Sequence, residues 1–498
     1  MPCSTFLFRL MNRLAKIAIP CLAALFLGAL YFRTLARGLS WAYAGADGGD
    51  LVTAAATGGV PHPTGYPTYL LLVSCFLKIP SGSFAYRSNL LSLVATILAA
   101  LLIYKLVLAS DGSVSSALIA SLVFGTFPLV WSQAIITEVY ALHAFLIVCM
   151  LYFFVVNTSH PFMDLLGGSI AGLAIGNHVT SIFMLPLMFG VDTHREKGLT
   201  NTVSRKRSFL SLMTLLAYRL IGFGLGLSVY LLIPIRARAQ APVNWGNANN
   251  LDGLIWLVTG QAYQSRLAHL NGSYLFTGVQ AWSHFLLEQL SIVGLLLSLI
   301  VLAVLFRPSR LYIATGWMLL AYSVFSIVYY SPDSYVYLIP ALIALSIWIG
   351  SGSRWFIERL SNKKSYLYLV ALLIIPAFFV LRAILAIPGM DLSNDRTAEK
   401  FAQVILDAAP NEAIIISQGD EATFALWYFH YAYRQRPDIA IVSSDLLVQP
   451  WYHDVLKYTY PDLVVPDGPW VQDWLRANPQ RSVCQVEPDL QPPVECSR

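Results

Sequence analysis

The chain has 498 residues, of which 57% are hydrophobic and only 12% are charged, and its formal net charge is +5 at pH 7. Soluble domains carry about 25% charged residues. Half that density over this length excludes a soluble globular enzyme and a disordered protein. The small net charge excludes a nucleic-acid partner, so the composition is that of a protein that crosses a membrane several times.

Membrane-spanning helices need about 20 mainly apolar residues, and the chain offers many such stretches. The clear candidates are 17–35, 89–109, 114–131, 139–156, 218–233, 284–306, 311–330, 335–349 and 366–387. A further apolar stretch, 164–191, is interrupted by Gly176, Asn177 and His178. This pattern predicts two short half-helices that meet at a polar kink, and about ten spans in all.

The positions of basic residues decide whether the short apolar segment 66–79 crosses the membrane, because Lys and Arg collect in cytoplasmic loops. The basic clusters are Arg9, Arg13 and Lys16; Arg195, Lys197, Arg205, Lys206 and Arg207; Arg307 and Arg310; and Arg354, Arg359, Lys363 and Lys364. All four fall on one side only if 66–79 does not cross and the half-helices go out and return. The N-terminus is then cytoplasmic. The non-cytoplasmic segments are 36–88, 132–138, 177–178, 234–283, 331–334 and everything after about 388.

The N-terminal apolar stretch has an alternative interpretation as a signal peptide, because Ala42-Tyr43-Ala44 resembles a cleavage site. The stretch is long, and cleavage would leave the acidic residues that follow at a free end. We therefore expect it to remain as a membrane span.

The tail from Asp391 is polar and changes pattern. A helix-like stretch at 397–409 precedes a β-run at 413–416, a helix-like stretch at 421–433 and a second β-run at 439–442. Strand, helix and strand at this spacing predict a parallel βαβ unit. We therefore divide the chain into a membrane domain, 1–388, and a small α/β domain, 391–498, in which Cys484 and Cys496 can pair in an oxidising compartment.

The first non-cytoplasmic loop carries the most informative residues. Asp47 and Asp50 flank two glycines, and His62 follows between two prolines. Two carboxylates three positions apart in a flexible turn can converge on one point. The alternative is a solvated turn in which Asp50 caps a helix, with His62 as a structural hydrogen-bond partner.

Other polar residues fall on the same predicted face. Glu138 lies at the mouth of a span, and Asn177 and His178 lie at the kink, where polar groups are costly and often functional. Their alternative role is a hydrogen-bonded kink. Arg236 follows a span directly. It can bind a phosphate, or, as the alternative, extend to lipid headgroups. Asp333 is interpreted as a turn residue, and Asp420 as a residue at the start of a helix.

These motifs resemble a family of multi-span proteins designated DUF2723, which includes transmembrane O-mannosyltransferases. Its usual loop is Asp-Ser-Gly-Glu followed by His-Pro-Pro-Gly-Tyr-Pro, and this chain departs from it at Gly48, Asp50 and Thr64. Asp50 keeps the charge but has a shorter reach than glutamate. The resemblance continues at Thr137-Glu138-Val139-Tyr140, at 176–180, from Arg236 through Trp245-Gly246, and from Asp420 through Trp427-Tyr428 to Arg436-Pro437-Asp438.

The resemblance implies a mainly α, polytopic bundle of the glycosyltransferase-C type, with about ten spans, the broken pair, interfacial helices and the small C-terminal α/β domain. It also implies a hexosyltransferase of the mannosyltransferase type. Such an enzyme moves a sugar from a polyprenyl phosphate to an acceptor hydroxyl on the non-cytoplasmic face, with inversion. Its membrane is the plasma membrane in a bacterium and the endoplasmic reticulum in a eukaryote.

The implied catalytic residues are Asp47, as general base, and Asp50. The implied substrate-binding residues are His62, Tyr66, Glu138, Asn177, His178, Arg236 and Trp245, with Arg236 on the phosphate. No metal or other cofactor is required, although Asp50 and Glu138 could hold a divalent ion. The expected partners are the lipid-linked donor, a protein, glycan or lipid acceptor, and membrane lipids, but no nucleic acid.

Two other functions remain open at this point. A polytopic protein with a broken helix pair could be a transporter or flippase of lipid-linked sugars, and a ligase could join preassembled glycans. A glycosyltransferase should hold Asp47 in a cavity on the outer face. A transporter should have a site at the bilayer midplane between two related halves.

Overall fold

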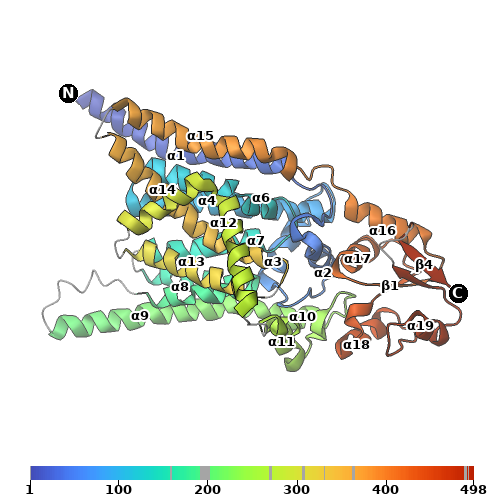
Figure 1. Ribbon diagram of the computed structural model, residues 1–498. Helices are drawn as coiled ribbons and strands as arrows, with labels where there is room; N and C mark the ends of the chain where they lie inside the picture. The colour runs from blue at the N-terminus through green and yellow to red at the C-terminus, as the bar shows by residue number, and fades with distance from the viewer. Residues whose placement is uncertain are drawn as a thin grey trace.

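The computed structural model describes residues 2–156, 160–190, 202–267, 272–305, 309–329, 331–361, 365–486, 491 and 493–498. A long helical bundle forms one part of the molecule, and a small sheet with its helices stands at one end of it (Figure 1). Among the described helices, seven are long and apolar enough to cross a membrane, or eight if one bent pair counts as a span. The prediction of about ten spans also counted 139–156 and the broken pair 164–191, whose helices are shorter.

The helices of the bundle are α1 (Pro2–Thr34), α2 (Gly48–Thr57), α3 (Pro67–Phe76), α4 (Phe84–Asp111), α5 (Val114–Thr126), α6 (Pro128–Ala134), α7 (Tyr140–Leu151), α8 (Pro161–Asn177), α9 (Thr202–Leu227), α10 (Leu232–Ala237), α11 (Leu251–Val258), α12 (Gly272–Ile300), α13 (Arg310–Val328), α14 (Ile339–Ser361) and α15 (Ser365–Met390). The short 3-10 and π segments between them are η1 (Ala42–Asp47), η2 (Tyr152–Val156), η3 (Val179–Phe189), η5 (Ser228–Leu231), η6 (Trp245–Asn247), η7 (Gln261–Leu267), η8 (Val301–Leu305) and η9 (Ser334–Leu338).

The predicted span 114–131 is broken by its proline. Helix α5 ends before Phe127, whose backbone is extended (φ −60°, ψ 129°), and α6 starts at Pro128. Proline has no N–H to donate, and it disfavours the helical conformation of the residue before it. The two helices are consequently bent by 66°. The predicted span 139–156 is also shorter than a full crossing, as helix Tyr140–Val156.

The predicted kink is present, since α8 ends at Asn177 and η3 begins at Val179. The contacts of Arg219 in α9 show how the two half-helices α8 and η3 run relative to each other. Its Nε donates to Asp164 near the start of α8 (2.9 Å), and its Nη1 donates to the Met188 carbonyl near the end of η3 (2.6 Å). One side chain reaches both ends, so the half-helices enter and return on the same side, as the sequence predicts.

Helix α3 does not cross the bundle. It has only ten residues, which span about 15 Å, half the thickness of a hydrocarbon core. Tyr66 precedes it in the left-handed region (φ 42°), and Pro67 occupies its first turn. The prediction that 66–79 is not a span agrees with this length.

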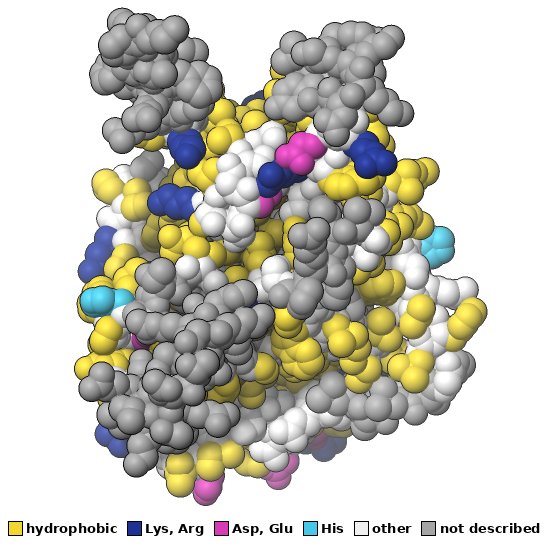
Figure 2. Space-filling view, turned by 90° about the vertical axis from the view of Figure 1, so that its left-hand side faces the viewer, with side chains coloured by type: hydrophobic (Ala, Val, Ile, Leu, Met, Phe, Trp, Pro, Cys, Tyr) yellow, Lys and Arg dark blue, Asp and Glu magenta, His cyan; other side chains and the backbone are white. Residues whose placement is uncertain are grey.

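The start of α1 and the sheet lie at opposite ends of the molecule (Figure 1). Figure 2 shows the end away from the sheet, where Lys and Arg side chains stand among hydrophobic ones. Arg354 of α14 donates to the Asp111 carbonyl at the end of α4. Of the predicted basic clusters, the following lie outside the described residues: Arg195, Lys197, Arg307, Lys363 and Lys364.

The elements after Met390 surround a four-stranded sheet of order β2-β1-β3-β4. They are α16 (Thr397–Ala408), β1 (Ile414–Ser417), α17 (Asp420–Trp427), η10 (Tyr428–Ala432), β2 (Ala440–Ser443), η11 (Ser444–Leu446), α18 (Pro450–Thr459), α19 (Val471–Ala477), β3 (Val483–Val486) and β4 (Val494–Ser497). Strands β1 and β2 are parallel, with Ile415 opposite Ile441. The predicted βαβ unit is therefore confirmed, and β3 and β4 add a parallel and an antiparallel strand that were not predicted.

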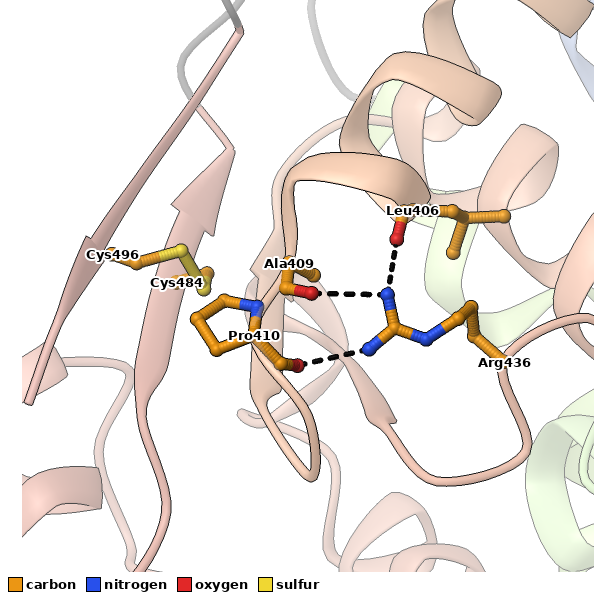
Figure 3. The surroundings of a disulfide bond; sticks show 6 residues. All are labelled: Leu406, Ala409, Pro410, Arg436, Cys484 and Cys496. Carbon is orange, nitrogen blue, oxygen red and sulfur yellow. Dashed lines mark hydrogen bonds between the residues drawn. A yellow bond between two sulfur atoms is a disulfide. The ribbon is translucent and has the colours of Figure 1, made fainter.

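Two features secure this sheet region (Figure 3). Cys484 and Cys496, opposite one another on β3 and β4, form the predicted disulfide. Arg436 donates to three carbonyls at the end of α16, those of Leu406, Ala409 and Pro410. The carbonyls at a helix end have no partner within the helix, so Arg436 both satisfies them and fixes α16 beside β2. It also pairs with Asp438, and this hydrogen bond holds the pKa of that carboxyl well below its usual range.

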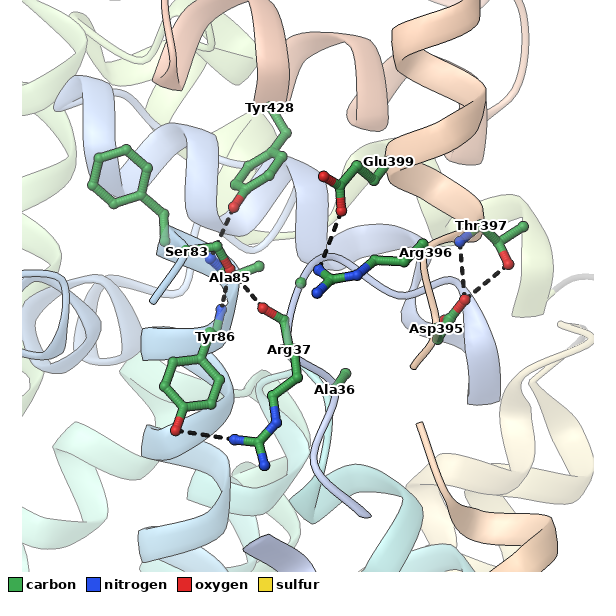
Figure 4. Close-up of polar contacts among 12 residues, drawn as sticks. Ala36, Arg37, Ser83, Ala85, Tyr86, Asp395, Arg396, Thr397, Glu399 and Tyr428 are labelled. Carbon is green, nitrogen blue, oxygen red and sulfur yellow. Dashed lines mark hydrogen bonds and ion pairs between the residues drawn. The ribbon is translucent and has the colours of Figure 1, made fainter. Parts of the chain in front are cut away.

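Polar contacts hold the sheet region against the bundle (Figure 4). The Ala85 N–H at the start of α4 donates to the Tyr428 hydroxyl of η10 (3.0 Å). Asp395 accepts a hydrogen bond from Ser40, ahead of η1. The region after Met390 is thus attached to the segment that carries the acidic motif.

Candidate active site

Residues 36–66, here called the acidic loop, fold back on themselves at the sheet end of the bundle. Tyr43 and Ala44 adopt the left-handed conformation (φ 59° and 62°), which few residues other than glycine adopt. Helix α2 follows directly after η1, which places Asp47 just before α2 and Asp50 in its first turn. The side chain of Asp47 is 33% exposed, whereas that of Asp50 is 0% exposed. The two carboxylates therefore lie in different environments.

Asp50 uses both of its oxygens within the protein. Its Oδ2 accepts from the His62 backbone N–H (2.8 Å) and contacts His62 Nδ1 (2.7 Å), and its Oδ1 accepts from Trp245 Nε1 (3.0 Å). It is neither a helix cap nor a group that substrate can reach. The sequence-based assignment of Asp50 as a second catalytic residue needs correction, because burial and three N–H donors make it a support for His62 and Trp245.

His62 connects the two aspartates. Its Nδ1 side is taken by Asp50, and its Nε2 lies 3.4 Å from Asp47 Oδ2. Burial alone would lower the pKa of His62, but Asp47 and Asp50 outweigh it and raise that pKa to about 9. Burial raises the pKa of Asp47 to about 6, although His62 opposes the rise. At neutral pH the pair is thus an imidazolium beside a carboxylate.

A cavity of about 490 Å³ opens beside this pair. Several stretches of the chain contribute to it: the acidic loop, the start of α7, the kink between α8 and η3, the segment 259–266 that includes η7, the segment 325–337 from the end of α13 into η9, and the start of α17. Its polar and aromatic lining residues include Asp47, His62, Tyr66, Tyr140, His178, Tyr263, Gln264, Arg266, Tyr329, Asp333, Tyr337 and Asp420. His178 packs against Tyr140 and Tyr337 with both ring centroids 5.6 Å away. The predicted residues Asp47, His62, Tyr66 and His178 therefore come together.

Three other predicted residues support the site without lining its cavity. Glu138 is buried and accepts from the Val139 N–H, while Asn177 donates to the Val139 carbonyl (3.1 Å). Both therefore stabilise the segment that leads into α7. Trp245 holds Asp50 and lies edge-on to His62, with ring centroids 6.2 Å apart. The hydrogen bond of Asn177 fits a structural role at the kink, which is the alternative to a role in substrate binding.

Arg236 is not at the cavity. Its Nη1 donates to the Ala54 and Gly59 carbonyls, and its Nη2 donates to Ser74 Oγ. The guanidinium thus ties the end of α2 to α3. The sequence-based assignment of Arg236 as the phosphate ligand needs correction, because its fork is occupied by backbone and hydroxyl oxygens.

Arg266 of η7 is the arginine that lines the cavity, among the described residues. Its guanidinium carbon lies 4.9 Å above the Tyr263 ring, and its Nη1 donates to Ser331 Oγ (3.1 Å). The sequence does not single it out, because it lies far from a predicted span boundary. Its one local signal is the tyrosine three residues before it, since arginine stacks on aromatic rings.

A divalent ion has no evident set of ligands here. Among the residues that the structure describes, no three or more His, Cys, Asp or Glu side chains converge at metal-binding distance. Asp50, which was expected to be able to hold such an ion with Glu138, already accepts three N–H donors. We therefore assign no metal ligand to either residue.

Two family models match parts of the chain. One, described as the N-terminal domain of the protein O-mannosyl-transferase TMEM260, matches residues 47–200, and the other, TMEM260-associated domain 2, matches residues 398–465. The chain resembles protein O-mannosyl-transferases. The first match begins at Asp47 and the second includes Asp420, so the two matched regions meet at the cavity. Neither description carries the expected label DUF2723, so only the O-mannosyltransferase part of that resemblance is supported.

Two curated relatives extend this similarity. The mouse protein O-mannosyl-transferase TMEM260 is 26% identical over 475 residues, which cover 89% of this chain and 65% of the mouse protein. The Dictyostelium discoideum protein of the same name is 24% identical and is matched over 63% of its length. The chain therefore spans slightly less than two thirds of these relatives.

Solved structures of ArnT from Cupriavidus metallidurans share the fold. The structure bound to undecaprenyl phosphate has a TM-score of 0.56 at 14% identity, with 94% of this chain and 92% of that chain covered. The apo structure has a TM-score of 0.54 at 12% identity. The predicted fold class, a glycosyltransferase-C-like membrane bundle with a small C-terminal α/β region, is confirmed.

Proposed function

We propose that this chain is a membrane glycosyltransferase that moves a mannose-type sugar from a polyprenyl phosphate to a hydroxyl group of a protein acceptor. The observation that carries the proposal is the cavity in which the Asp47 carboxylate lies beside the His62 imidazole, together with an arginine, Arg266. The names of the similar proteins support the sugar and the acceptor. The undecaprenyl phosphate bound to ArnT supports a lipid-linked donor.

The proposed reaction is a single displacement. Asp47 takes the proton of the acceptor hydroxyl as that oxygen attacks the anomeric carbon. The bond from this carbon to the phosphate oxygen breaks, its electron pair stays on the phosphate, and the configuration inverts. Arg266 and the imidazolium of His62 stabilise the departing phosphate, because fixed donors are most effective where charge develops in the transition state.

The same geometry argues against a transporter. A transporter should bind its substrate at the bilayer midplane between two related halves. This cavity is instead lined partly by the start of α17, in the sheet region at one end of the bundle (Figure 1). Its acidic and basic groups match a transfer reaction better than a passage through the membrane.

The direct test is an assay of the purified full chain with a panel of polyprenyl-phosphate sugars and a threonine-containing peptide. We expect consumption of the polyprenyl-phosphate mannose and a glycosylated peptide. Consumption of no donor in the panel would refute a glycosyltransferase. Movement of intact donor across vesicles without consumption would favour a flippase, and transfer of only preassembled glycans would favour a ligase.

Arg266→Ala should weaken donor binding by about 2–5 kcal/mol if the guanidinium pairs with a desolvated phosphate. The measurement is the dissociation constant of the polyprenyl-phosphate sugar. Arg238→Ala is the matched control, because Arg238 is exposed and lies outside the cavity. Arg236→Ala should instead lower thermal stability, since it leaves the Ala54 and Gly59 carbonyls without this donor. A donor affinity that falls in Arg236→Ala but not in Arg266→Ala would restore the original assignment.

We also propose that the sheet region, 391–498, is a domain on the non-cytoplasmic side of the membrane domain, 1–388, and that the N-terminus is cytoplasmic. The Lys and Arg side chains at the end of the bundle away from the sheet (Figure 2) support this orientation. A C-terminal reporter that is active only in the cytoplasm should be silent, whereas an N-terminal copy should be active. The opposite pattern would place the cavity on the cytoplasmic face.

A further inference from the structure

The sheet region forms part of the cavity wall. Helix α17 begins at Asp420, directly after the turn that follows β1, and Asp420 lines the same cavity as Asp47. In parallel sheets, ligands bind where strands end and the following helices begin. Asp420 has that position in the βαβ unit. Glu421 is the next residue, and it is exposed and absent from the lining of the cavity.

Close packing fixes the position of α17 relative to the acidic loop. Gly49 of α2 lies so near α17 that an added Cβ would come within 2.5 Å of the Phe424 carbonyl oxygen. The Phe424 ring also contacts the Trp245 ring, with centroids 6.3 Å apart. Since Trp245 holds Asp50, one packed unit sets the positions of the acidic loop and of Asp420.

Electrostatics limits what Asp420 can bind. Partial desolvation in the cavity raises the pKa of Asp420, and among the neighbours His62 opposes the rise while Asp50 adds to it. Asp420 in turn adds to the raised pKa of Asp47. A carboxylate repels a phosphate, so Asp420 suits a part of the substrate that donates hydrogen bonds. The residue is also accessible to solvent, on the sheet side of the cavity.

We infer, on the basis of the proposed function, that Asp420 is a positioning residue for the polypeptide acceptor. A donor anchored by a polyprenyl chain reaches the cavity from the bundle, whereas a protein acceptor arrives from solvent, past α17. The Asp420 carboxylate accepts a hydrogen bond from an N–H or O–H of the acceptor segment. This contact holds the reacting hydroxyl toward Asp47. The sheet region thereby selects the acceptor, while the bundle binds the donor.

The test compares Asp420→Asn with the neighbouring control Glu421→Gln in the purified full chain. With polyprenyl-phosphate mannose as donor, transfer to a threonine-containing peptide and hydrolysis by water are measured in parallel. Loss of a hydrogen bond to a charged group weakens binding by about tenfold or more. We expect the KM for the peptide to rise by that factor in Asp420→Asn, and the ratio of transfer to hydrolysis to fall with it. Glu421→Gln should match the unmodified protein.

An Asp420→Asn protein with an unaltered peptide KM would overturn the inference, as would equal losses of transfer and hydrolysis. Size-exclusion and thermal-unfolding profiles establish that both variants fold. If the unmodified chain consumes no donor, the proposed function fails. The dissociation constant of the peptide then decides the inference separately, with tenfold weaker binding supporting it and equal binding refuting it.

Discussion

Asp47→Asn should reduce sugar transfer by about 10²–10⁴-fold, which is the usual contribution of a general base. The amide keeps the size of the side chain and can still contact His62 Nε2, 3.4 Å away in the structure. It cannot take the proton of the acceptor hydroxyl. Donor binding should persist, because it depends on Arg266 and on the lipid chain. The measurement is the turnover number at saturating donor and peptide.

The control for this substitution is Asp252→Asn, which removes an exposed carboxylate in the first turn of α11, outside the cavity. It should transfer at the normal rate. An Asp47→Asn protein that transferred sugar nearly as fast as its control would eliminate Asp47 as the base. The fold and the cavity would still stand, and the proton would need another acceptor among the cavity side chains.

The pH profile provides a second test of Asp47. Burial raises its pKa to about 6, and a base acts only in its ionised form. Transfer should therefore rise as the pH increases through about 6 and be lost below it. A rate that stayed constant down to pH 5 would contradict the assignment.

Much of the fold follows from hydropathy and local chemistry. The apolar stretches predict the long helices, and Asn177 with His178 predicts the kink. Two β-runs around a helix predict the βαβ unit to within a residue. The break at Pro128 was also readable, because proline ends a helix by a local effect. Strands β3 and β4 have four residues each and no distinctive pattern, so only their pairing with β1 defines them.

The site was predictable in part, where local sequence marks an unusual backbone. Asp47, His62 and His178 stand beside prolines, glycines or a helix break, which mark unusual backbone. Arg236 and Arg266 lie in the same predicted loop, and the sequence does not say which guanidinium meets carbonyl oxygens and which meets a cavity. The burial of Asp50 likewise depends on Trp245, which is 195 positions away in the chain. Contacts of that range come from the tertiary fold.

The second large effect is expected at Asp50, through His62. Asp50→Asn removes the anion beside His62 Nδ1 and leaves one carbonyl oxygen in place of two carboxylate oxygens, with three N–H groups still directed at the side chain. The imidazole loses its orientation and part of its proton affinity. Transfer at neutral pH should fall about 10²-fold, the lower end for acid–base catalysis.

The shape of the pH profile separates this role from simple damage to the fold. His62 has a pKa of about 9 because two carboxylates favour its charged form against burial. If the imidazolium stabilises the departing phosphate, transfer declines as the pH rises through about 9. Loss of the Asp50 charge lowers the pKa of His62, so in Asp50→Asn the decline should begin at lower pH. A misfolded protein would lose activity equally at every pH.

A double-mutant cycle tests whether Asp50 acts through His62. His62→Gln removes the imidazolium, so adding Asp50→Asn to it should cost little more in transfer, although each change alone is severe. Trp245→Phe is the matched comparison, because it removes one donor to Asp50 and leaves both bonds from His62. It should reduce transfer much less than Asp50→Asn. Independent, multiplying losses for Asp50 and His62 would mean that Asp50 supports the site by a route other than the imidazole.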